Sequence, residues 1–197
     1  MKVDIFNTDR KYDVIYADPP WEYQDKGCSG AANKHYPTLS DQDIHKLPIG
    51  KCAKKDCVLF LWATMPKLQE ALDTIKAWGF KYKTCAFCWV KQNPKSGGIF
   101  AGIGRWVQGN AELCLLATKG HPHRASKSVK QIVLAPRGRH SEKPAEVRKR
   151  IETLMGGGGA HRAFCPSVSR RLGRLGQRSL IILKGKETKS CMLHDRI

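Results

Sequence analysis

The run CVLFLWAT, Cys57 to Thr64, constrains the fold more than any other part of the sequence. It is continuously apolar, which is typical of a strand buried on both faces of a sheet. An amphipathic segment, MPKLQEALDTIKAWGF, follows at once. Its apolar residues recur at helical spacing, Pro66 suits a first helical turn, and Gly79 suits a C-terminal stop. A buried strand followed by an amphipathic helix predicts a layered α/β fold.

Other segments fit the same architecture. Further strands are predicted at residues 12–17, 82–91 and 111–120, and further helices at residues 38–47 and 143–154. Ser40 is a candidate N-cap, with Asp43 placed as in a capping box. The alternation of strands and helices indicates a single domain in which helices cover both faces of a mostly parallel sheet. The glycine-rich residues 91–106 predict a mobile loop.

The chain is strongly basic, with a formal charge of +18 over 197 residues. Such a balance predicts a polyanionic partner, and nucleic acid is the simplest one. Residues 156–197 hold nine basic and two acidic residues, and residues 1–155 still carry +11. The basic excess therefore does not depend on the C-terminal tail.

The sequence has no pattern typical of a membrane or secreted protein. No apolar run reaches the roughly 18–20 residues that span a bilayer, and residues 1–13 lack a signal-peptide core. We expect a soluble, cytoplasmic protein whose eight cysteines stay reduced. Cys85 and Cys88 have the spacing of half a zinc site, but Cys52 and Cys57 are too widely spaced to complete it. We expect no metal.

The run DPPW, Asp18 to Trp21, directly follows the first predicted strand. Two adjacent prolines cannot continue a sheet, because neither has the N–H that pairing requires. A simple strand exit would account for an Asp and a Pro here. The four residues also offer a chemistry, since the Asp18 carboxylate and the Pro19 carbonyl could hold both N–H groups of a base amine. The nitrogen lone pair then becomes available, Trp21 could stack on the base, and an electrophile held in line would react by positioning alone.

This run and the segments after it resemble the MT-A family, relatives of the catalytic subunit of the mRNA N6-adenosine methyltransferase. The resemblance covers residues 11–155 and rests, in this order, on DPPW, HYPTLSDQDI, LFLWAT, WGFKYKTCAFCWVK, GRWVQGNAELCLLATKG and RHSEKPAEV. It implies a single-domain, Rossmann-like α/β methyltransferase sheet and S-adenosylmethionine as the methyl donor. It also implies the N6 amine of adenine in nucleic acid, DNA more than RNA, as the acceptor.

The resemblance gives particular residues a role. The expected catalytic residues are Asp18, Pro19, Pro20 and Trp21. Asp18 and Lys143 are expected to bind the donor, Lys143 through the donor's carboxylate. The expected acceptor contacts are Tyr36, Arg105 and Glu112, together with Trp106.

Plainer roles remain open for several of these residues and their neighbours. Tyr36 could pack on the core, and Lys143 could be a solvated lysine at a helix start. Trp89 and Lys91 lie at a predicted strand end near the expected site, where Trp89 could equally be a core residue. His140 could bind a ligand or cap the loop at Ser141.

Two other functions fit the same residues. One is a nucleic-acid-binding relative without catalytic activity: the altered C-terminal segment argues for it, and the intact DPPW run argues against it. Cytosine-N4 methylation uses a similar acceptor chemistry, but the remaining family segments favour adenine. The target sequence and the oligomeric state do not follow from the sequence.

The C-terminal residues depart from the family. Its members end in a strand resembling LFAR and a segment resembling GW..WGNE, whereas this chain continues GGGGAHRAFCPSVSRRLGRLGQRSL. One set of codons for AHRAFCPS, read one nucleotide later, gives Pro-Thr-Val-Leu-Phe-Ala-Arg. We therefore hypothesise a one-nucleotide frameshift near Gly156–Gly159. Residues 1–155 would then form the methyltransferase domain, and residues 156–197 a basic tail that cannot complete the donor pocket.

Overall fold

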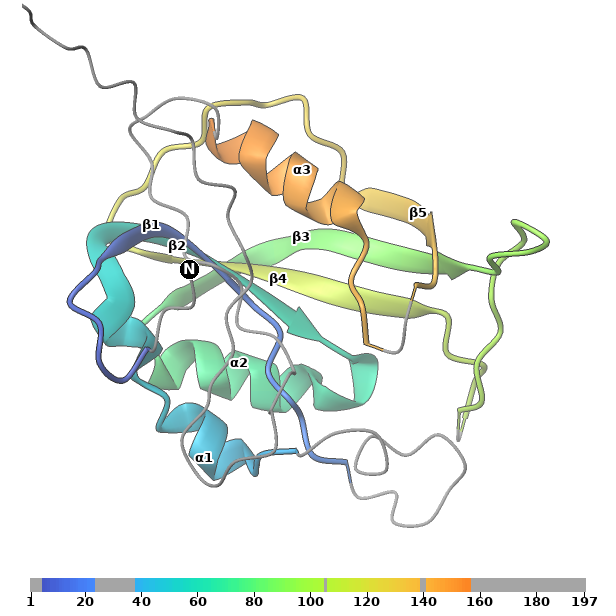
Figure 1. Cartoon of the computed structure of the whole chain (residues 1–197), viewed down its shortest axis with the longest axis horizontal. Coiled ribbons are helices and arrows are strands. Elements are labelled where there is room, and N and C mark those ends of the chain that lie inside the picture. Colours follow the sequence, from blue (N-terminus) through green and yellow to red (C-terminus); the bar gives the residue numbers. More distant parts are fainter. Residues whose placement is uncertain (1–4, 24–37, 105, 139–140, 157–197) are drawn as a thin grey trace, which may run out of the picture.

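The computed structural model describes residues 5–23, 38–104, 106–138 and 141–156. These residues form a five-stranded sheet with helices on both of its faces (Figure 1). The strands are β1 (Tyr12–Ala17), β2 (Ala53–Ala63), β3 (Lys81–Gln92), β4 (Ala111–Lys119) and β5 (Ile132–Pro136). The helices are α1 (Asp41–His45), α2 (Leu68–Ala77) and α3 (Ala145–Met155), with 3-10 turns at Pro48–Cys52 and Met65–Lys67. The predicted α/β class is confirmed.

The sheet has the strand order β1-β2-β4-β3-β5 and is mixed. The pairs β1–β2 and β3–β5 are parallel, whereas β4 runs antiparallel to both β2 and β3. β1, β2, β3 and β5 therefore point the same way, as expected of a mostly parallel sheet, and β4 is the strand that departs from this expectation. The connection from β3 to β4 returns the chain beside β3, so the carboxyl ends of β1, β2 and β3 share one edge with the start of β4.

Strand periodicity divides the core into two layers. In β1, Ile15 and Ala17 pack on the α1–α2 side, and Val14 and Tyr16 pack on the α3 side. Figure 1 shows α3 above the sheet and α1 and α2 below it. Because β2 lies between both layers, residues Cys57 to Ala63 are all buried, as the continuous apolar run predicts.

Local sequence signals define the helix ends as expected. The Ser40 side chain accepts a hydrogen bond from the Asp43 backbone N–H at 3.1 Å and caps α1. Pro66 lies in the 3-10 turn that leads into α2, and Gly79 follows that helix with a φ of 79°. Pro144 is the residue that precedes α3.

Two segments differ from the sequence-based expectation. β5 was not predicted, because its short run IVLAP has no alternating pattern. Residues 91–106 were predicted to be a mobile loop, but Lys91 and Gln92 belong to β3, and bridges join Gln92 to Ile99 and Gly102 to Gly109. Of the proposed tail, residues 156–197, all but Gly156 lie outside the described residues. Among the described helices, none combines the length and apolar composition required to cross a membrane.

Candidate functional site

The turn after β1 is fixed by its own backbone. The Trp21 N–H donates to the Pro19 carbonyl at 2.9 Å, and the Leu39 N–H donates to the Pro20 carbonyl at 3.0 Å. Asp18, the first residue of the turn, is 6 % exposed. Since a carbonyl oxygen has two lone pairs, the Pro19 oxygen keeps the capacity to accept a second hydrogen bond. The turn therefore holds a buried carboxylate and a positioned carbonyl side by side in sequence.

Trp21 does not present an open ring face in this structure. Its side chain is 1 % exposed, belongs to the core on the α1–α2 side, and donates its indole N–H to the Trp62 carbonyl at 3.1 Å. The stacking role expected for Trp21 therefore finds no support in this arrangement. What Trp21 does here is tie the turn to the end of β2.

Strand alternation brings three charged side chains to one place. Asp18, Lys91 and Glu112 each lie two positions from a residue of the core on the α3 side, namely Tyr16, Trp89 and Cys114. Residues two apart in a strand point to the same face. All three charges therefore lie toward α3, at the edge that the carboxyl ends of β1 and β3 share with the start of β4. Lys143, just before α3, joins them from above.

These four side chains form an ion-pair chain, Asp18–Lys143–Glu112–Lys91. The Lys143 Nζ donates to Asp18 Oδ2 at 3.0 Å and lies 3.2 Å from Glu112 Oε2. The Lys91 Nζ donates to Glu112 Oε1 at 2.7 Å. Their side chains are between 8 % and 21 % exposed. Two acids and two bases alternate, so the buried charge sums to zero.

The two lysines favour the ionised form of Glu112. Burial acts to raise the pKa of Glu112, but Lys143 and Lys91 outweigh it, and the pKa lies below its usual value. The Lys143 ammonium also lies 5.3 Å from the centroid of the Trp62 ring, within the range of a cation–π contact. A lysine held this way is a fixed positive charge beside a carboxylate.

Trp62, at the end of β2, connects the parts of the site and was not singled out in the sequence. Its carbonyl accepts from Trp21, its indole N–H donates to the Tyr16 hydroxyl at 2.7 Å, and its ring faces Lys143. Burial raises the pKa of Tyr16 well above its usual value, so this hydroxyl stays neutral. The available signal was a tryptophan at the carboxyl end of a fully buried strand, where ligands are expected.

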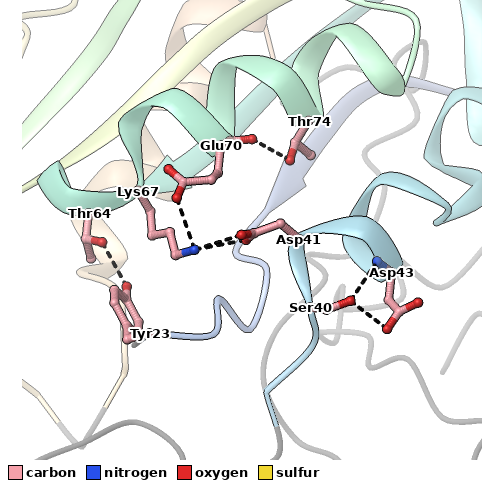
Figure 2. A network of polar contacts seen from close by, with 8 residues as sticks. All are labelled: Tyr23, Ser40, Asp41, Asp43, Thr64, Lys67, Glu70 and Thr74. Atoms are coloured by element: carbon pink, nitrogen blue, oxygen red, sulfur yellow. Dashed lines mark hydrogen bonds and ion pairs between the residues drawn. The ribbon is translucent and has the colours of Figure 1, made fainter. Parts of the chain in front are cut away.

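A second polar network anchors the chain that follows the DPPW turn (Figure 2). The Tyr23 hydroxyl and the Thr64 hydroxyl are 2.8 Å apart. The Lys67 ammonium donates to both carboxylate oxygens of Asp41, at 3.1 and 2.9 Å, and to Glu70 at 3.2 Å. Burial acts to lower the pKa of Lys67, but the two carboxylates outweigh it and the pKa is raised. These contacts fix Tyr23 and the start of α1 to the segment that follows β2.

The structure places the remaining predicted residues as follows. Tyr36, Arg105 and His140 lie outside the described residues. Trp89 is a buried core residue, and its indole N–H donates to the Ala135 carbonyl at 2.9 Å. Trp106 lies between β3 and β4 and is 97 % exposed. Asp18, Lys143 and Glu112, which are far apart in sequence, are brought together.

The residues present suit one end of the expected donor. The amino-acid end of S-adenosylmethionine carries a carboxylate and an ammonium group, which need a cation and an anion. Lys143 and Asp18 offer these at 3.0 Å from each other. In the described residues no group of three His, Cys, Asp or Glu side chains is arranged to hold a metal ion.

Comparison with known proteins gives a consistent result. The MT-A70 family model matches residues 12–165. A type II methyltransferase of Mycoplasma sp, M.MunI, is 34 % identical over 160 residues, which are 70 % of this chain and 65 % of that protein. An N(6)-adenosine-methyltransferase MT-A70-like protein of Drosophila melanogaster is 30 % identical over 149 residues, which are 75 % of this chain and 23 % of that protein.

A third relative is named differently. The N6-adenosine-methyltransferase non-catalytic subunit MTB of Arabidopsis thaliana is 33 % identical over 127 residues, which are 62 % of this chain and 16 % of that protein. The chain thus spans less than two thirds of the length of these relatives. The family match nevertheless includes the DPPW turn, the strands β1 to β5 and helix α3. The chain belongs to the MT-A70 family.

Proposed function

We infer that this chain transfers a methyl group from S-adenosylmethionine to the N6 amine of adenine in nucleic acid, DNA more than RNA. The observation that carries the proposal is the meeting of Asp18 with Lys143 and Glu112 at the ligand-binding edge of the sheet, directly after β1. The family membership supports the reaction class. DNA is favoured because the Mycoplasma relative is a type II methyltransferase, a class that acts on DNA.

Each residue of the site has a role in this reaction. S-adenosylmethionine supplies an electrophilic methyl group when bound. Asp18 accepts one N–H of the adenine amine, and the Pro19 carbonyl accepts the other through its free lone pair. Lys143 serves the donor's carboxylate, and its ion pair with Glu112 holds that lysine in place. Positioning of amine and donor, more than acid–base chemistry, then accounts for the rate.

The proposed contacts with the acceptor follow from the family resemblance and from the charge of the chain. We assign Tyr36, Arg105 and Glu112 to contacts with the nucleic acid, as the family resemblance implies. The +11 on residues 1–155 supplies the general attraction to phosphates. A cytoplasmic location is part of the same proposal.

The test is methyl transfer by the Asp18→Asn variant of the full chain. Asparagine keeps the size of the side chain, but its amide cannot serve as a charged acceptor. We expect incorporation of labelled methyl groups into DNA to fall at least about a hundred-fold, a loss typical of a removed catalytic group. Asp73→Asn is the matched control, because Asp73 is exposed on α2 and accepts hydrogen bonds from Gln69. Activity of Asp18→Asn near the parent level contradicts the assignment.

A second candidate is a non-catalytic nucleic-acid-binding subunit. The relationship to the Arabidopsis non-catalytic subunit favours it. If this second function is correct, the parent chain binds DNA with strong salt dependence. Neither the parent chain nor the Asp18→Asn variant then transfers a methyl group. The same experiment therefore separates the two functions.

A further inference from the structure

A row of three aromatic side chains, Tyr16, Trp62 and Trp89, lies beside the ion-pair chain. Trp62 and Trp89 belong to the core on the α3 side of the sheet, and Tyr16 packs against it. The ring centroids of Tyr16 and Trp62 are 6.4 Å apart, and those of Trp62 and Trp89 are 6.2 Å apart. Both contacts are edge-to-face, a favourable arrangement for aromatic pairs. The three rings therefore support one another across the sheet.

Each lysine of the ion-pair chain lies over one of these rings. The Lys143 Nζ is 5.3 Å from the centroid of the Trp62 ring, and the Lys91 Nζ is 5.4 Å from the centroid of the Trp89 ring. Both distances are within the range of a cation–π contact. The two tryptophans therefore help to set where the ammonium groups lie on either side of Glu112.

Both tryptophans are held by their indole N–H groups, but the two acceptors differ. Trp89 donates to the backbone carbonyl of Ala135 at 2.9 Å, and the sheet fixes that carbonyl. Trp62 donates to the side-chain hydroxyl of Tyr16 at 2.7 Å. Trp62 is 1 % exposed, and a buried N–H without an acceptor is unfavourable. The orientation of the Trp62 ring therefore depends on one hydroxyl group.

Packing alone does not require that hydroxyl. A phenylalanine at position 16 would fill the same space and keep the edge-to-face contact with Trp62, but it would offer no acceptor. Tyr16 also lies two positions before Asp18, so both side chains are on the α3 face of the sheet. The hydroxyl thus acts on the face where the ion-pair chain lies.

We propose that Tyr16 is a positioning residue for Lys143 and acts through Trp62. The Tyr16 hydroxyl holds the indole of Trp62. The Trp62 ring in turn holds the Lys143 ammonium where it meets its two carboxylate partners. The consequence for donor binding rests on the proposed function, which assigns Lys143 to the donor's carboxylate. Tyr16 itself contacts neither donor nor acceptor in this assignment, so its effect is on the place of the lysine.

The test observes Lys143 directly, by NMR of the full chain with 13C-labelled lysine. The ring current of a tryptophan displaces the ε-methylene signal of a lysine that lies over its face. Lys143→Arg identifies the signal by its loss. We expect Tyr16→Phe to move this signal toward that of an exposed lysine such as Lys46. The measurement requires no bound donor.

Tyr23→Phe is the matched control for a general loss of stability. The Tyr23 hydroxyl is also hydrogen-bonded to one side chain, Thr64, at 2.8 Å. Tyr23 packs against the core on the opposite, α1–α2 side of the sheet. Both variants lose a hydrogen bond, so both should lower the melting temperature by a few degrees. Only Tyr16→Phe should move the Lys143 signal.

Trp62→Phe tests whether Tyr16 acts through Trp62. Phenylalanine keeps an aromatic ring but has no N–H to donate. In the Trp62→Phe background, Tyr16→Phe should leave the Lys143 signal where Trp62→Phe alone places it, because the connection is already broken. A second movement of similar size would show that Tyr16 reaches Lys143 by another route, and it would overturn the proposal.

Calorimetric titration of the same variants with S-adenosylmethionine measures the consequence for the donor. Tyr16→Phe should weaken binding about three- to ten-fold, less than the complete loss of a hydrogen bond to a charged group. The proposal is wrong if the Lys143 signal stays in place in Tyr16→Phe or moves equally in Tyr23→Phe. A moved signal with unchanged or absent donor binding counts against the proposed function and leaves the positioning role of Tyr16 in place.

Discussion

Replacement of Glu112 by glutamine probes the ion-pair chain at its centre. Glu112 lies between the ammonium groups of Lys91 and Lys143, at 2.7 and 3.2 Å. Glutamine keeps the shape of the side chain and can still accept a hydrogen bond, but it removes one negative charge. The site is then left with two lysines and one carboxylate, Asp18, in a largely buried space.

The structure sets the size of the effect. Breaking a buried ion pair costs about 3–5 kcal/mol, because a charge is left without its counterpart. Lys143 retains Asp18, and Lys91 is 21 % exposed, so it can gain some hydration. We therefore expect Glu112→Gln to lower the free energy of unfolding by about 2–3 kcal/mol, at or just below the lower limit of that range. For a chain of this size the melting temperature falls by about 5–10 °C.

The stabilisation by Glu112 depends on pH in a defined direction. The pKa of Glu112 in the folded chain is below its usual value. In the unfolded chain a glutamate takes up its proton near a pH of about 4.3. The contribution of the carboxylate is thus fully present above the unfolded pKa and is lost as the pH falls through the lower, folded pKa. The stability difference between parent and variant is constant from about pH 5 to 8 and narrows below about pH 4.

Urea unfolding followed by circular dichroism at several pH values measures this difference. Glu152→Gln is the control, since Glu152 forms an exposed helical pair with Arg148 on α3. Such a pair contributes about 0.5 kcal/mol or less. If Glu112→Gln destabilises the fold no more than this control, or if the difference stays constant while the chain is acidified but still folded, the account of the ion-pair chain is wrong.

Further outcomes follow from other parts of the molecule. Lys67→Met should lower the melting temperature and speed hydrogen exchange in α1, because Asp41 and Glu70 lose their shared cation, whereas the exposed Lys46→Met should do neither. The pKa of Cys57 is raised to about 12 by burial, so a thiol reagent at a pH of about 8 should modify it only after unfolding. If residues 156–197 are out of frame, calorimetry should show weak or absent S-adenosylmethionine binding by this chain and tight binding once the shifted frame is restored; equal affinities would contradict the frameshift hypothesis.

Local signals in the sequence determined the individual elements. The apolar run of β2, the cap at Ser40 and the stop at Gly79 each depend on neighbouring residues, so their meaning can be read without a fold. The position of Asp18 at a strand end is also determined by neighbouring residues. The DPPW run and the order of the family segments were sufficient to indicate the family, which the comparison then confirmed.

The tertiary structure decided how these elements meet. The antiparallel direction of β4 depends on which strands become its neighbours, and the apolar pattern of a strand is the same in either direction. The contact between Lys143 and Asp18 spans 125 residues, and the role of Trp62 depends on three separate partners. Trp21 shows that a motif alone does not determine whether a side chain is accessible. From the sequence its ring could stack on a base, but in this structure the packing of β2 against the turn buries the ring. Residue type supplies the chemistry that is available, and only the packing determines which groups are accessible to a ligand.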